Sequence, residues 1–191
     1  MLNRAGYVLV GGQSSRFGSD KALHLIEGRP LALTVADRVR SAAGSVTLVG
    51  SPEKYTATGL PVIADSEPGL GPAGGLAAAL TQRAARRILV VACDMPEIRV
   101  ELLALLLETA ERRQADVLMP VSPDGRDQPL CAVYAASAAD AVERRIAAGD
   151  RKLSYVLADL VIERLKPEDY AAVDPGGRSF LNVNRPEDLP L

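Results

Sequence analysis

A segment near the N-terminus combines residue types that bind phosphate. The apolar run Val8–Val10 leads into Gly11 and Gly12, and the cations Arg16 and Lys21 follow shortly after. Glycines let main-chain N–H groups come close to an anion, while Arg and Lys supply positive charge for its oxygens. The segment matches neither the P-loop nor the dinucleotide-binding fingerprint. It predicts a cradle for nucleotide phosphates, and a solvated Gly/Ser turn is the alternative.

Two carboxylates follow apolar runs further along the chain. Asp94 comes after the segment Arg87–Ala92 and precedes a proline, and Asp65 closes the segment Leu60–Ala64. A carboxylate at such a position can hold Mg²⁺ against phosphate oxygens, which predicts a metal ligand at Asp94. Asp65 is a candidate nucleoside contact. The alternatives are a helix N-cap for Asp94 and a turn for Asp65.

The remaining polar candidates lie near the C-terminus. Asn182 and Asn184 fall on the same side of an extended segment, where two amides can orient a phosphate, a carboxylate or a metal-bound water. Turn formation before a proline is the alternative. No Ser or Cys stands at a recognisable triad spacing from His24, so we expect no catalytic role for it. Cys93 and Cys131 are expected to be small buried apolar residues.

The chain alternates apolar runs with helical patterns, which predicts an α/β fold. We expect a single three-layer domain over residues 1–191, with a mostly parallel sheet, helices on both faces and mixed strand directions in the second half. Ligands of such sheets gather beyond the carboxyl ends of the strands, where the candidate residues fall. The predicted strands are Gly6–Val10, Val46–Val49, Leu60–Ala64, Arg87–Ala92, Val117–Val121, Leu130–Tyr134, Val161–Leu165 and Phe180–Val183. The predicted helices are Leu31–Ala43, Leu76–Arg83, Arg99–Arg113, Ala138–Ala148 and Leu153–Asp159.

Composition limits the classes of partner. The chain has 191 residues, 48% of them hydrophobic, and a formal net charge of −2, which argues against broad binding to nucleic acid or to a membrane surface. No stretch is apolar enough to span a bilayer, so a cytoplasmic location is expected. Two cysteines form neither a disulfide framework nor a metal cluster.

Six motifs, taken together and in chain order, resemble those of the molybdenum cofactor guanylyltransferases (MobA-type nucleotidyltransferases). They cover nearly the whole chain. Departures from the family pattern are Val10, Phe17, Ala73-Gly74 and Arg185, and the segment Val49-Gly50-Ser51 lacks a recognisable polar nucleotide contact. The matching segments are Leu9 to Lys21, Gly28-Arg-Pro-Leu31, Gly71-Pro-Ala-Gly-Gly75, Cys93-Asp-Met-Pro96, Gln128 to Tyr134 and Phe180 to Leu189.

The resemblance implies a nucleotide-diphospho-sugar transferase (Rossmann-like) fold and transfer of GMP from GTP to the phosphate of Mo-molybdopterin, with Mg²⁺ as cofactor and pyrophosphate as product. It also implies transient contacts with proteins that insert the cofactor or accept it. By resemblance, the catalytic residues are Arg16, Lys21 and Asp94, and Asp94 is the metal ligand. The implied nucleotide-binding residues are Leu9, Val10, Gly11, Gly12, Lys21, Asp65 and Asp94. The implied pterin-binding residues are Arg126, Gln128, Pro129, Asn182 and Asn184.

Other activities stay open at this point. The cytidylyltransferase of the same cofactor has a closely related motif, and Gly11 together with Asp20-Lys21 favours guanine over cytosine. Sugar-1-phosphate nucleotidyltransferases share the implied fold but not the matches at Gln128-Pro129 and in the C-terminal segment. A non-catalytic carrier of molybdopterin or nucleotide is a third alternative, and the presence of Lys21 and Asp94 argues against it.

Overall fold

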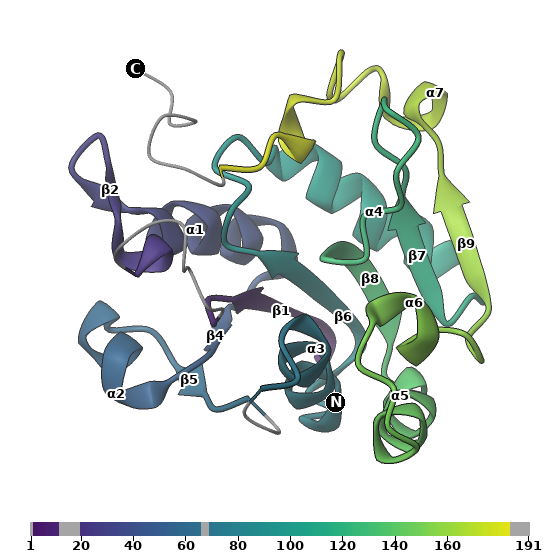
Figure 1. Cartoon of the computed structure of the whole chain (residues 1–191). Helices are drawn as coiled ribbons and strands as arrows, with labels where there is room; N and C mark the ends of the chain where they lie inside the picture. The colour runs from purple at the N-terminus through teal and green to yellow at the C-terminus, as the bar shows by residue number, and fades with distance from the viewer. Residues whose placement is uncertain (1, 12–19, 66–68, 184–191) are drawn as a thin grey trace.

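A computed structural model describes residues 2–11, 20–65 and 69–183. Within these residues, one seven-stranded sheet runs through both halves of the chain in the order β5-β4-β1-β6-β8-β7-β9 (Figure 1). Its first four strands are parallel, β8 runs antiparallel to both neighbours, and β9 is parallel to β7. The mostly parallel sheet with mixed directions in the second half is therefore confirmed. The strands are β1 (Leu2–Leu9), β4 (Thr47–Val49), β5 (Val62–Ile63), β6 (Ala85–Ala92), β7 (Val117–Pro120), β8 (Cys131–Ala135) and β9 (Ile162–Leu165).

Helices cover both faces of this sheet, because the strands carry apolar side chains on both faces. Val8 of β1 packs in the core beneath α1 (Leu31–Ala43) and α4 (Val100–Arg112), whereas Tyr7 packs in the core beneath α3 (Pro72–Thr81) and α5 (Ala138–Ala147). Successive strand residues point to opposite faces, so apolar residues at both positions bury both faces. The short helix α6 (Leu153–Val156) joins the second layer. Among the described residues, no helix is both long and apolar enough to cross a membrane.

The C-terminal segment differs from its prediction. Phe180–Val183 does not join the sheet, because Phe180 ends a 3₁₀ turn, η3 (Arg178–Phe180), and the N–H of Val183 donates to the carbonyl of Asp94. Gly176 and Gly177 precede it with φ values of 85° and 65°, which only glycine adopts without strain. The predicted strand is therefore wrong, and its first residue belongs to a local turn.

Several short elements were not predicted. Each is only two to four residues long, which is too short for a hydrophobic period to show in the sequence. A two-stranded hairpin turns at Glu27 and Gly28, both with positive φ, as its tight reversal requires. The unpredicted elements are β2 (Leu25–Ile26), β3 (Arg29–Pro30), α2 (Pro52–Tyr55), α7 (Pro167–Tyr170), η1 (Lys21–Leu23) and η2 (Thr56–Thr58).

Candidate functional site

The register of the parallel strands brings four strand ends to one edge. Leu9 lies opposite both Val49 and Ala92, and Val49 lies opposite Ile63. Residues that follow these ends therefore project from the same edge, where ligands of parallel α/β sheets bind. Two positions beyond the four strand residues stand Gly11, Ser51, Asp65 and Asp94.

Lys21 and Asp94 meet at this edge, although 73 positions separate them. Lys21 Nζ lies 3.1 Å from Asp94 Oδ2, and the two side chains are 14% and 25% exposed. Asp94 is not a helix N-cap, because α4 begins at Val100 and its N-cap is Arg99. Asp94 Oδ1 is buried and has no hydrogen-bond partner among the described residues. A buried carboxylate oxygen without a hydrogen-bond partner is a candidate ligand for a cation.

The Asp65 carboxylate is packed between two glycines. A Cβ on Gly11 would lie 3.2 Å from Asp65 Oδ2, and a Cβ on Gly75 would lie 3.1 Å from Asp65 Oδ1. The same Cβ on Gly75 would also approach Leu9 Cδ2 to 3.2 Å. Burial raises the pKa of Asp65. The glycines of two separate motifs thus make room for one carboxylate.

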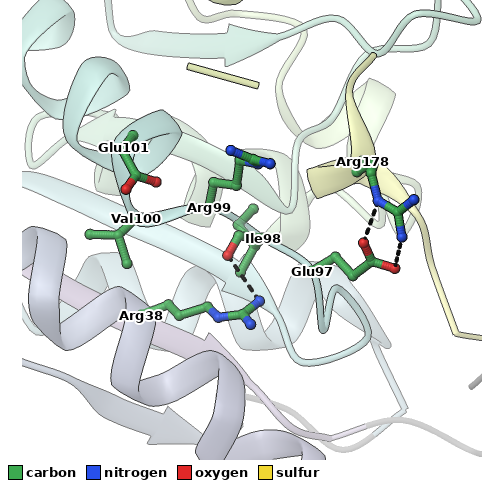
Figure 2. A pocket seen from close by; sticks show the side chains of 7 residues that line it. All are labelled: Arg38, Glu97, Ile98, Arg99, Val100, Glu101 and Arg178. Atoms are coloured by element: carbon green, nitrogen blue, oxygen red, sulfur yellow. Dashed lines mark hydrogen bonds and ion pairs between the residues drawn. The ribbon is translucent and has the colours of Figure 1, made fainter. Parts of the chain in front are cut away.

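The segment that follows Asp94 is held by Arg38 and Arg178, and Figure 2 shows both side chains bound to residues of that segment. Arg38 of α1 donates hydrogen bonds to the carbonyls of Pro96 and Ile98, the latter at 3.0 Å. Arg178 makes a two-pronged ion pair with Glu97, with N···O distances of 2.6 and 2.9 Å (Figure 2). These side chains line a cavity of about 350 Å³ beside the segment. Arg38 and Arg178 are therefore both bound to protein groups, and these bonds fix the course of the chain after Asp94.

The C-terminal segment is joined to the same place. The N–H of Val183 donates to the carbonyl of Asp94 at 2.9 Å. The Ser179 hydroxyl accepts the N–H of Arg99 at 3.0 Å, which satisfies a donor at the start of α4. Asn182, which precedes Val183, is exposed. One of the two predicted amides therefore lies next to a residue that contacts the Asp94 main chain.

The other predicted pterin-binding residues share the loop between β7 and β8. Arg126 is exposed and pairs with Asp124 at 3.2 Å. Gln128 donates to the Ser122 hydroxyl at 3.0 Å, and the carbonyl of Pro129 accepts the hydroxyl of Tyr134. This loop contacts the C-terminal segment, because a Cβ on Gly177 would meet Pro123 Cγ at 2.4 Å. Within the part of the chain that the structure describes, we find no hydrogen bond or ion pair between Asn182 and the loop residues Arg126, Gln128 and Pro129.

Three of the predicted site residues, Gly12, Arg16 and Asn184, lie outside the described residues. Leu9 and Val10 are buried at the end of β1, and Gly11 is exposed beside them. Cys93 and Cys131 are buried, and burial raises the pKa of each thiol to about 12, as expected for residues that serve in packing.

The sequence did not predict a role for Tyr55, whose side chain lies beside the carboxyl end of β1. Its hydroxyl is 2.8 Å from the carbonyl of Val10 and 2.8 Å from Asp20 Oδ2. Its one sequence signal was Pro52, which commonly starts a helix and here begins α2. A helix start alone does not predict where a tyrosine hydroxyl three residues later will reach.

Comparison with known proteins places the chain in a family. A model of the MobA-like NTP transferase domain matches residues 6–166. The chain belongs to this family. A probable molybdenum cofactor guanylyltransferase of Chloroflexus aggregans is 36% identical to it, over 98% of this chain and 92% of the relative. The molybdenum cofactor guanylyltransferase of Burkholderia lata is 38% identical, over 97% of this chain and 93% of the relative.

A solved structure of this MobA-like family has the same architecture. The molybdopterin-guanine dinucleotide biosynthesis protein A of Archaeoglobus fulgidus superposes with a TM-score of 0.83 at 31% identity, covering 96% of this chain and 94% of its own. The expected nucleotidyltransferase α/β fold is thereby confirmed. The chain is a nucleotidyltransferase by family, with Lys21 and Asp94 at the carboxyl edge of its sheet.

Proposed function

We propose that this MobA-like chain transfers GMP from GTP to the terminal phosphate of Mo-molybdopterin, which forms the molybdopterin guanine dinucleotide and releases pyrophosphate. The observation that carries the proposal is the Lys21–Asp94 pair at the strand ends, with one carboxylate oxygen unpartnered among the described residues. The names of the relatives support GTP and molybdopterin as the substrates.

The nucleotide would lie over the end of β1. By resemblance, the main chain from Leu9 to Gly11 would contact it there, and Asp65, which stands beside Gly11, would be a polar nucleoside contact. Guanine presents N1–H and N2–H₂ as donors, whereas cytosine presents acceptors at N3 and O2. A site whose buried polar groups are left unpaired by the wrong base discriminates strongly between the two.

The residues at the edge fit a divalent cation, for which we propose Mg²⁺. Asp94 Oδ1 is the buried oxygen that would hold it. The described residues contain no cluster of three or more His, Cys, Asp or Glu side chains. Mg²⁺ keeps several waters and binds through one or two carboxylates plus substrate phosphates, so a single carboxylate such as Asp94 would be enough to hold it together with GTP. When bound, the cation supplies charge neutralisation on the triphosphate.

The reaction needs no nucleophile from the protein. A phosphate oxygen of the pterin attacks the α-phosphorus of GTP, the new P–O bond forms, and the bond to the β-phosphate oxygen breaks as pyrophosphate leaves. The difficulty is the repulsion between two anions, so positioning and positive charge supply the catalysis. Lys21 supplies that charge next to Asp94, and Arg16, outside the described residues, is proposed for the same role by resemblance.

The pterin would occupy the side of the C-terminal half. We assign it to Arg126, Gln128 and Pro129 on one loop, and to Asn182 and Asn184 on the segment that bonds to Asp94. The hydrogen bond from Val183 to the Asp94 carbonyl supports this assignment, because it brings the second segment to the strand ends.

The test is pyrophosphate release measured with GTP, Mg²⁺ and purified Mo-molybdopterin, followed by mass spectrometry of the product. We expect pyrophosphate and the guanine dinucleotide in equal amounts, and neither when the pterin is left out. Binding of both ligands with no pyrophosphate formed would instead identify the chain as a carrier.

A further inference from the structure

The Tyr55 hydroxyl connects two ends of the phosphate-binding motif. Val10 and Asp20 flank residues 11–19 in the sequence, and both offer an oxygen at 2.8 Å from Tyr55 Oη. The Tyr55 hydroxyl has one proton, so the carbonyl of Val10 and the carboxylate of Asp20 share a single donor. Tyr55 is the last residue of α2, which follows β4, so it is distant in sequence from both Val10 and Asp20.

The ring of Tyr55 is fixed in place by its packing. Its side chain is buried, and a Cβ on Gly50 would lie 2.9 Å from Tyr55 Cε2 and 2.8 Å from Val10 Cγ2. Gly50 therefore has no room for a side chain, and the ring lies directly against the backbone that follows β4. Burial, together with the neighbouring Asp20 carboxylate, raises the pKa of Tyr55, so the hydroxyl remains a donor at neutral pH.

Asp20 connects the Tyr55 hydroxyl to the turn that carries Lys21. Its Oδ1 accepts the N–H of Ala22 at 3.1 Å, which caps the turn η1 that begins with Lys21. Its Oδ2 receives Tyr55, with Lys54 Nζ further away at 3.7 Å. The two Asp20 oxygens therefore bind different groups: Oδ1 caps the turn η1, and Oδ2 accepts the hydrogen bond from Tyr55.

We propose that Tyr55 is a positioning residue for nucleotide binding, which sets the spacing between the end of β1 and the Asp20-Lys21 turn so that both meet the GTP phosphates. This inference rests on the function proposed above. It assigns a role in the site to a side chain that touches no substrate and acts through Val10 and Asp20.

The variant Tyr55→Phe keeps the buried ring and removes only the hydroxyl. We expect the Kd for GTP and the KM for GTP to rise about tenfold, since a hydrogen bond to a charged group is lost. We expect kcat to change less than about threefold, because Lys21 keeps its ion pair with Asp94. A purely structural role would lower the Tm without this division between KM and kcat.

The matched control is Tyr170→Phe, which removes another tyrosine hydroxyl that donates to a carbonyl, that of Val121, also at 2.8 Å. We expect a similar loss of Tm and an unchanged Kd for GTP. In a double-mutant cycle, Tyr55→Phe should cost less in an Asp20→Ala background than in the wild type, because Asp20 is one of the groups through which it acts.

Calorimetric titration with GTP distinguishes the outcomes. If the wild type binds GTP and Tyr55→Phe binds it equally well, the role of Tyr55 is refuted and the proposed function stands. An equal effect of Tyr55→Phe with and without Asp20 would refute the connection through Asp20. Absence of GTP binding by the folded wild type would overturn the proposed function and this inference together.

Discussion

At the carboxyl ends of β1 and β6, Lys21 and Asp94 face each other and one oxygen of Asp94 has no described partner. In the loop between β7 and β8, by contrast, Gln128 is bonded to Ser122 and Arg126 is paired with Asp124. The strand-end pair thus has a carboxylate oxygen without a described partner, whereas each loop side chain has a protein partner that a bound pterin would share or displace. We therefore expect substitutions at the strand-end pair to affect catalysis more than substitutions in the loop.

The strongest test of this difference is Asp94→Asn. This variant keeps the size of the side chain and removes its charge, so we expect kcat for pyrophosphate release to fall by at least ~10²-fold if Asp94 holds the metal. Asp140→Asn is the control, since Asp140 is an exposed residue on α5 that pairs with Arg83. Near-normal turnover by folded Asp94→Asn protein would contradict the metal assignment.

Lys21→Ala should have the next largest effect. The cation faces phosphates in the ground state and in the transition state, so we expect weaker GTP binding and a loss in kcat/KM of about 10- to 100-fold. Lys166→Ala removes an exposed cation from the second half and should leave both quantities within about twofold. The account of the phosphate site is wrong if calorimetry gives Lys21→Ala the wild-type affinity for GTP.

Asp65→Asn should change stability and binding in opposite directions. Burial raises the pKa of Asp65 above its ordinary value of 3.8, so the stability cost of ionising this carboxyl begins as the pH rises through 3.8 and is complete above the folded pKa. At pH 7 the amide removes this cost, and we expect a higher Tm together with about tenfold weaker GTP binding. Below pH 3.8 the difference in Tm should disappear, since the carboxyl is then neutral in both folded and unfolded protein. A lower Tm at pH 7 with unchanged GTP binding would refute this role.

The smallest effects are expected at the two glycines. Gly11→Ala and Gly75→Ala each place a methyl against the Asp65 carboxylate, which must then shift by a few tenths of an ångström. We expect each variant to reduce the preference for GTP over CTP by about threefold. In an Asp65→Asn background the loss should be smaller, and an equal loss there would mean that the methyl acts on the nucleotide directly.

The parts of the site that follow strands were predictable from sequence. A run of apolar residues that ends in a carboxylate fixes both the strand and the edge to which the carboxylate belongs, and this placed Asp94 and Asp65 correctly. The ion pair between Lys21 and Asp94 was not predicted, because Lys21 stands twelve positions after the end of β1 and strand register does not fix its place.

The features that sequence reasoning missed depend on contacts between segments distant in the sequence. Nothing in the residues around Tyr55 indicates that its hydroxyl reaches Val10 and Asp20, because that contact requires β4 to lie beside β1. Phe180–Val183 was predicted as a strand from its local pattern. Asp174 instead accepts the N–H of Ser179 at 3.1 Å and supports a turn there.

The most direct test of the proposed activity is a comparison of GTP with CTP in steady-state transfer to Mo-molybdopterin. Both nucleotides are assayed under the same Mg²⁺ concentration, and kcat/KM is taken from pyrophosphate release. The account predicts a higher kcat/KM for GTP and a guanine dinucleotide as product. Equal values, or a preference for CTP, would contradict the assignment of GTP and identify the chain as a cytidylyltransferase or an unselective enzyme.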